Sequence, residues 1–260
     1  MSVIPPFTPN GYSQLLEQLS DLGYELRPAT PGHVQRAKKY DIKTCFLRHD
    51  VDLHIADIMA IAGREEDHSD TTRSCWFIRP DACYNIGLPA NVYRLEALRD
   101  EHHHLGLHYD VDRIASTKQP SATIARMETA MRWMIDPGGD STFFTAIAPH
   151  RVTNAQRVDP LRNSAKQSLP SDGSVAYISD STRRWRQDVP YRIDHVLSGL
   201  QSPRLLQLNL HPEWWMNPII TGREAHLSNH TAPLTVRDCR AAVADESRAW
   251  KSHPGIEIEA

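Results

Sequence analysis

The 260-residue sequence has few cysteines, namely Cys45, Cys75, Cys83 and Cys239. No two of them are spaced as a Cys-x-x-Cys pair, which argues against a zinc knuckle or a dithiol redox centre. Cys45 and Cys75 lie inside apolar runs that resemble strands, where we expect buried, reduced thiols. The chemistry of this protein therefore has to be sought in other residue types.

Long apolar runs and a strong excess of one charge are also missing. No stretch approaches the roughly 18 apolar residues of a membrane span, and residues 1–9 lack the basic start and apolar core of a signal peptide. The formal net charge is −3, so the basic footprint of a nucleic-acid-binding protein is absent. We expect a cytoplasmic globular protein that binds neither nucleic acid nor a membrane and acts on a small-molecule or glycan substrate.

Several catalytic motifs are absent as well: a Gly-rich phosphate loop, a Gly-x-Ser-x-Gly elbow and a Cys–His nucleophile pair. Without a covalent nucleophile, water activated by a metal ion is the natural hydrolytic scheme. The chain has 14 histidines, several of them beside carboxylates or at the ends of apolar runs. This is the one compositional hint of metal or acid–base chemistry.

Apolar runs of strand length alternate with helical periodicities along the chain. Strands are expected near residues 44–49, 74–78, 105–109, 143–147, 175–178 and 205–210, and helices near 12–22, 55–66, 92–98, 124–134 and 234–250. Residues 151–174 and 216–233 have the composition of long polar loops. The alternation predicts one parallel α/β domain over residues 1–260, with a core at about 40–215 and the terminal helices packed on it.

The last strand indicates which kind of α/β fold to expect. Along 205–211, leucines alternate with the polar residues Gln207, Asn209 and His211. A doubly wound sheet is buried on both faces and rarely tolerates such a polar row. A barrel interior that opens onto an active site tolerates it better. We therefore predict an irregular, TIM-barrel-like (β/α) barrel whose functional groups lie at the C-terminal ends of its strands.

The segment Arg48-His49-Asp50-Val51-Asp52 closes the first expected strand. Strand alternation places Arg48, Asp50 and Asp52 on one face. Two close carboxylates repel each other unless a cation or a shared proton relieves them, so one can bind a metal while the other acts as a base. Taken alone, the segment is equally typical of a strand that runs into an acidic turn.

Histidines end three other segments. His108 follows an apolar strand and is a metal-ligand candidate, which Asp112 can supplement if the chain turns helical there. His150 is a third ligand, a substrate contact or a surface histidine. His211 is a candidate general acid or base whose orientation a carboxylate can set. The dense run 102–104 is expected to be a solvated helix end.

Substrate contacts are expected from polar and aromatic residues on the same rim. Arg79 and Asp110 end strands, and Asp180 either orients an acid–base residue or starts a turn. Trp214 and Trp215 either stack on a sugar or pack a loop onto the core. We assign all five residues to substrate binding as a working hypothesis.

Short motifs along the chain resemble those of the polysaccharide deacetylase family (carbohydrate esterase family four). Arg48–Asp52 resembles the first motif, most closely in the branch that carries His-Asp-Val-Asp. Leu105–Asp110 is similar to that branch's Glu-Ile-Gly-Leu-His-Tyr-Glu segment, and Leu208–Trp215 to its closing His-Pro-x-Trp-Trp motif. Tyr177–Ser181 is similar to a weaker motif between them. The resemblance extends from about residue 40 to 215, and the order of the motifs makes it specific.

This resemblance implies an irregular (β/α) barrel, usually of seven strands, with a divalent metal that is commonly zinc. Family members hydrolyse N-acetyl or related amide and ester groups on sugars. By the same resemblance, Asp50 is the base that activates water, Asp52 and His108 hold the metal, and His211 protonates the leaving amine.

The sequence departs from the family pattern at two points. The usual metal triad is one Asp and two His four residues apart, and here the second histidine position is Asp112. His150 falls near the place of a family Arg, with Arg151 next to it. The third ligand is thus Asp112, His150 or absent. We expect a metal-dependent deacetylase; the alternatives are a barrel that binds carbohydrate without turnover and an amidohydrolase of non-sugar amides.

Overall fold

The computed structural model describes residues 4–52, 55–80, 82, 84–111, 114, 117–136, 144–150, 161, 164–170, 172–186 and 190–216. Its strands are β1 (Glu25–Pro28), β2 (Thr44–Val51), β3 (Cys75–Ile78), β4 (His104–Asp110), β5 (Phe144–His150), β6 (Ala176–Ser179) and β7 (Leu205–Leu210). Its helices are α1 (Pro9–Asp21), α2 (Pro31–Tyr40), η1 (Ile55–Asp57), α3 (Ile58–His68), α4 (Pro89–Asp100), α6 (Pro120–Ile135), η2 (Ser181–Arg183), α7 (Ile193–Leu197) and α8 (Pro212–Met216).

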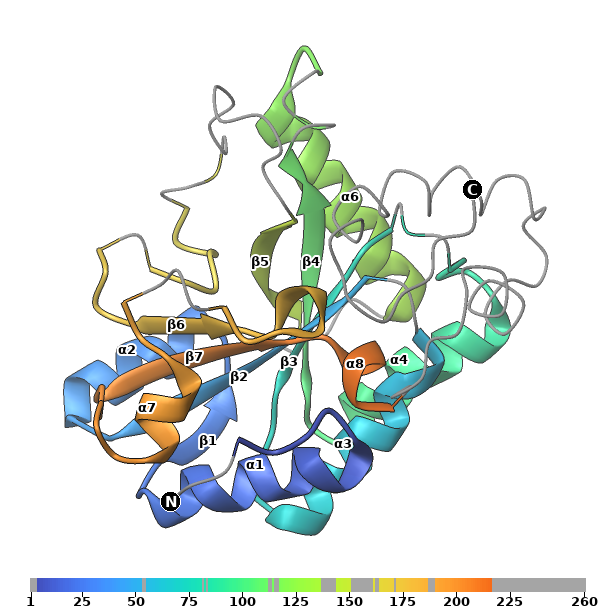
Figure 1. Cartoon of the computed structure of the whole chain (residues 1–260). Coiled ribbons are helices and arrows are strands. Elements are labelled where there is room, and N and C mark those ends of the chain that lie inside the picture. Colours follow the sequence, from blue (N-terminus) through green and yellow to red (C-terminus); the bar gives the residue numbers. More distant parts are fainter. Residues whose placement is uncertain are drawn as a thin grey trace, which may run out of the picture.

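The strands form one parallel sheet in the order β5-β4-β3-β2-β7-β6, and β1 also pairs with β2. Strand β2 pairs with three other strands, β1, β3 and β7. One edge of β2 pairs first with β1, where Cys45 faces Leu26, and then with β3, where Asp50 faces Phe77. The other edge pairs with β7 over six residues. From β6 to β5 the sheet curls into a half-barrel (Figure 1).

This architecture confirms the expected parallel α/β class and is compatible with a barrel. The six expected strands all form, and β1 is the seventh strand of the sheet. Closure of the sheet into a full (β/α) barrel stays a prediction. The helix expected at 234–250 and the loop expected after residue 216 lie outside the described residues. No helix in the described part of the chain is long and apolar enough to cross a membrane.

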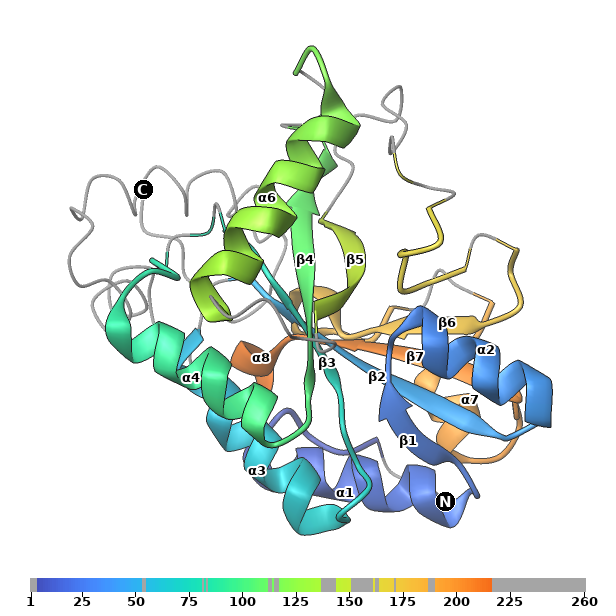
Figure 2. The ribbon, with the colours of Figure 1, turned by 180° about the vertical axis from the view of Figure 1, so that it is seen from behind.

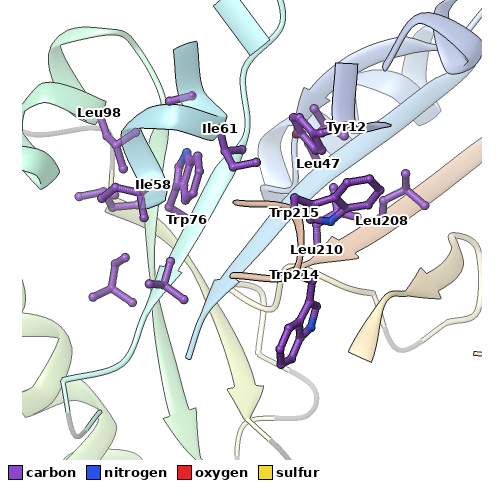
Figure 3. Packing of buried hydrophobic residues seen from close by; sticks show 14 of the residues in the cluster. Tyr12, Leu47, Ile58, Ile61, Trp76, Leu98, Leu208, Leu210, Trp214 and Trp215 are labelled. Atoms are coloured by element: carbon purple, nitrogen blue, oxygen red, sulfur yellow. The ribbon is translucent and has the colours of Figure 1, made fainter. Parts of the chain in front are cut away.

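The convex face of the sheet carries most of the apolar core. Helices α1, α3, α4 and α6 pack side by side in that order, with α6 along β4 (Figure 2). Leu47, Trp76 and Leu208 from neighbouring strands meet Tyr12 of α1 and Ile61 of α3 in this core (Figure 3). The leucines of β7 thus face helices, as the alternation predicted.

The concave face has a smaller apolar cluster, which includes Phe46, Phe77, Ala146 and Ala148. Helix α2 contributes Val34 and Ala37 to this cluster. Cys45 and Cys75, on opposite faces, are both buried and free, as expected. The remaining concave positions near the C-terminal ends of the strands are polar, and these form the candidate site.

Candidate functional site

Four predicted residues from three distant strands come together at the C-terminal rim of the sheet. His108 Nε2 lies 3.4 Å from Asp50 Oδ2 and 3.6 Å from Asp52 Oδ1. His211 Nε2 lies 3.8 Å from Asp52 Oδ2. Parallel pairing of β2 with β3 and β7, and of β3 with β4, aligns the ends of these strands. The sequence prediction that these four side chains share one rim is therefore confirmed in its geometry.

Asp50 is held by an arginine from its own strand. Arg48 donates two hydrogen bonds to it, Nε to Oδ1 at 2.7 Å and Nη2 to Oδ2 at 2.8 Å. The pair forms because residues two apart on a strand face the same side. Burial alone would raise the pKa of Asp50, but Arg48 and then His108 keep that pKa below its ordinary value. Asp50 is therefore a carboxylate at neutral pH.

A phenylalanine ring forms the floor beside this pair. The Arg48 guanidinium lies 5.0 Å from the centre of the Phe77 ring, and the His108 ring lies 6.5 Å from it. The ring has room because residue 106 on the next strand is glycine. A Cβ at Gly106 would lie 2.6 Å from a Phe77 ring carbon. The Leu-Gly-Leu segment before His108 thus owes its glycine to this close approach.

The tautomer of His108 follows from its second partner. His108 Nδ1 lies 3.0 Å from the carbonyl oxygen of Ala148, which can only accept a hydrogen bond, so Nδ1 carries the proton. The other ring nitrogen, Nε2, faces Asp50 and Asp52. A histidine whose other ring nitrogen is fixed by a carbonyl is the usual arrangement of a metal ligand.

His211 differs from His108, because the partner of its Nδ1 is a carboxylate and not a backbone carbonyl. Its Nδ1 lies 2.6 Å from Asp180 Oδ1, and the backbone N–H of His211 and the indole N–H of Trp215 both donate to Asp180 Oδ2. Burial would lower the pKa of His211, but the charges of Asp180, Asp52 and Glu213 raise it to about 10. His211 is therefore a buried cation with a proton on Nε2. Of the two roles considered for Asp180, the structure supports the orienting one.

The donor set fits two ligands of a divalent-metal site. Tetrahedral zinc with bonds near 2.1 Å places two ligand atoms about 3.4 Å apart, close to the 3.6 Å between His108 Nε2 and Asp52 Oδ1. In the described part of the chain, however, no three His, Cys, Asp or Glu side chains form a group that could hold a metal. Asp112 and the side chain of His150 lie outside the described residues. Arg79 Nη1 is 4.0 Å from Asp52 Oδ1.

The remaining predicted contacts divide between rim and core. Asp110 ends β4 as the register partner of His150 on β5, and its side chain is partly exposed. Trp214 and Trp215 are buried. The Trp215 ring packs against Tyr12 with 5.4 Å between centroids, so its burial favours core packing over sugar stacking.

The run 102–104 was expected to be a solvated helix end, and His102 is exposed but His103 is not. Helix α4 ends at Asp100, and His103 is fully buried, where its Nδ1 accepts the backbone N–H of Ser74. His103 belongs to a convex-face cluster around Glu65 that sequence reasoning missed. Glu65 accepts hydrogen bonds from Tyr12 at 2.5 Å and Ser74 at 2.6 Å, and lies 2.7 Å from His49 Nε2. One signal was present, because Glu65 lies seven residues after Ile58 on the apolar stripe of its helix.

Glu213 was also missed. Its side chain is fully buried, and neither carboxyl oxygen has a hydrogen-bond partner within the described residues. Burial raises its pKa well above the ordinary value, and the charges of Asp52 and Asp180 add to this. Glu213 therefore binds a proton more readily than an exposed glutamate does.

Comparisons with family models, curated proteins and solved structures found no match to this chain. Function therefore has to be argued from the geometry of the site and from the motifs.

Proposed function

We propose that this protein is a metal-dependent hydrolase that removes an N-acetyl or other acyl group from an amino sugar or sugar-like substrate. The observation that carries the proposal is the convergence of Asp50, Asp52, His108 and His211, with 3.4–3.8 Å between the facing atoms. The motifs that resemble polysaccharide deacetylases assign the same residues to the same reaction, and a closed (β/α) barrel belongs to this proposal.

The environments of Asp50 and His211 divide the acid and base roles between them. Asp50, kept ionised by Arg48, accepts a proton from the attacking water. The water oxygen bonds to the acyl carbon, and the bond from that carbon to nitrogen breaks. His211, kept protonated by Asp180, gives its Nε2 proton to the departing nitrogen. The products are a carboxylic acid and an amine.

Asp52 and His108 would hold the divalent metal, and zinc suits a nitrogen and a carboxylate oxygen as ligands. When bound, the cation would polarise the acyl oxygen and lower the pKa of the attacking water. Arg79 adds a fixed positive charge near Asp52, on the side of β3. We assign it to substrate binding.

A panel assay tests this function. Purified protein supplied with zinc is incubated with N-acetylglucosamine and its short oligomers, and the released acetate and primary amine are quantified. We expect stoichiometric release of both products by the native chain and none by His211→Gln. Release at equal rates by both proteins would refute the role of His211.

A second candidate function is a barrel that binds carbohydrate without turnover. It is favoured by the finding that the described residues supply only two metal ligands. In the same panel, sugar binding measured by calorimetry without any acetate release would select this alternative.

A further inference from the structure

Asn209 lies on the concave face directly beneath the candidate site. It precedes His211 by two residues on β7, and its register partners are Arg48 on β2 and Ser179 on β6. Its side chain is only 4% exposed. Asn209 therefore occupies the layer below the proposed acid and base, with one strand neighbour on each side.

The amide group of Asn209 has a defined orientation. Its Nδ2 donates to the hydroxyl of Tyr177 at 2.9 Å and lies 3.4 Å from Ser179 Oγ, both on β6. Since an amide is planar, with its oxygen opposite its NH₂ group, Oδ1 points away from β6, toward β2 and the Arg48–Asp50 pair. That oxygen is buried and has no hydrogen-bond partner among the described residues.

A buried acceptor without a donor is costly, so such an atom in a candidate site indicates that a ligand or a water completes it. The size of that ligand group is limited by its surroundings. Arg48, Phe77 and Asn209 are all buried and fill the layer beneath Asp50 and His211. Any group that meets Oδ1 therefore has to be small, and the bulky part of a substrate has to remain at the rim.

In the proposed reaction the acyl carbon lies between Asp50 and His211. The departing sugar is too large for the floor, so the substituent on the acyl carbon is the part that points down toward Asn209. A plain methyl group there would leave Oδ1 without a donor. A hydroxyl on the same carbon would supply one.

We propose that Asn209 selects the acyl group and that the preferred substrate carries a small hydroxyacyl group, such as N-glycolyl, over N-acetyl. The inference rests on the proposed function and adds the identity of the acyl group to it. Tyr177 is the positioning residue, since its hydroxyl holds the amide of Asn209.

The test compares N-glycolylglucosamine with N-acetylglucosamine, which differ by one hydroxyl. For the native protein we expect kcat/KM to favour the glycolyl substrate at least roughly tenfold, because a site built to bind a hydroxyl rejects the analogue that lacks it. Asn209→Leu should lose the preference, so that its kcat/KM values for the two substrates become nearly equal, and Tyr177→Phe should reduce the preference. Equal rates in the native protein, or an unchanged preference in Asn209→Leu, would overturn the inference.

Gln207→Leu is the matched control, because Gln207 lies one layer deeper on the same face of β7 and is also buried. Its substrate preference should equal that of the native protein, and a loss of preference in this control would contradict the role given to Asn209.

Binding of glycolate and acetate, measured by calorimetry, separates the two proposals. If neither sugar is hydrolysed, the proposed function fails. Tighter binding of glycolate by the native protein but not by Asn209→Leu would still support the acyl-site assignment, and equal binding of the two acids would overturn it.

Discussion

Two buried polar clusters lie back to back on β2, and they differ in the spacing of their atoms. On the convex face, the carboxyl oxygens of Glu65 lie 2.5–2.7 Å from polar side-chain atoms of Tyr12, His49 and Ser74. On the concave face, His108 Nε2 faces two carboxylates at 3.4 and 3.6 Å. His49 and Asp50 are adjacent in the chain, yet each belongs to a different cluster.

The difference in spacing indicates a difference in role. Short bonds to one carboxylate tie α1, α3, β2 and the start of β3 together, which is what a structural cluster does. Facing atoms 3.6–3.8 Å apart, as between His108, Asp52 and His211, leave room for a cation, a water or a reacting group. We therefore expect substitutions in the convex cluster to change stability first, and substitutions in the concave cluster to change activity first.

The largest expected effect is on activity, in Asp180→Asn. Burial would lower the pKa of His211, and Asp180 contributes most to raising it to about 10, so the loss of Asp180 lowers that pKa and removes the proton at lower pH. We expect activity at pH 8 to fall about 10²-fold or more, the range of general acid catalysis. The alkaline limb of the pH–rate profile should also move to lower pH. A limb that stays in place would show that Asp180 does not set the protonation of His211.

Glu65→Ala should have the largest effect on stability. It leaves the buried polar groups of Tyr12, His49 and Ser74 without their acceptor, and removal of one partner from a buried pair costs about 3–5 kcal/mol. Urea unfolding measures this loss. Glu17→Ala on α1 is the matched control, since the Glu17 side chain is exposed, and it should change stability by less than about 1 kcal/mol. Equal losses in the two variants would contradict the comparison.

Acid should weaken the convex cluster in two stages. Burial lowers the pKa of His103 to about 4, so stability falls as the pH drops from 6.5 toward 4, by up to about 3 kcal/mol. Burial alone would raise the pKa of Glu65. Its contacts with His49 and Ser74 instead hold that pKa below the ordinary value of 4.5. Its contribution is therefore present above pH 4.5 and is lost as the pH falls further. Urea unfolding at pH 7, 5 and 4 checks this, and constant stability between pH 7 and 4 would contradict it.

The smallest expected change is in Gly106→Ala. The added Cβ would meet the Phe77 ring at 2.6 Å, and overpacking of this kind costs about 1–3 kcal/mol. The double variant with Phe77→Leu should recover part of the loss. Gly63→Ala on α3 is the control, because a Cβ there meets nothing within 4 Å. Its thermal midpoint should stay the same or rise, and a fall as large as that of Gly106→Ala would contradict the packing argument.

The sequence predicted six of the seven strands, including the four-residue β3 and β6, and missed β1 and α2. β7 forms over the expected residues because its leucines alternate with polar side chains. β1 was missed because Leu26 is its only aliphatic residue, between Glu25 and Arg27, and because it ends at Pro28. α2 was missed because only Val34 and Ala37 are buried on it, which is too few for a readable apolar stripe.

The candidate site was predictable to the extent that topology alone determines it. Parallel strands bring their C-terminal ends to one rim, so Asp50, His108 and His211 could be placed together before their distances were known. The partners of Glu65 could not be predicted, because they depend on how α3 packs against β2 and β3. The spacing of two residues predicted that Arg48 and Asp50 lie on the same face of their strand. It did not predict the two hydrogen bonds between them.

Metal binding tests the central claim most directly. Zinc bound per chain is measured by elemental analysis and calorimetry for the native protein, Asp52→Ala and His108→Ala. His68→Ala serves as the control, because His68 is a partly exposed histidine that is hydrogen-bonded to Ser20. We predict one zinc per native chain, unchanged in the control and weakened at least about 100-fold in both site variants. Bound metal that is unchanged in both site variants, or absent from the native protein, would contradict the account.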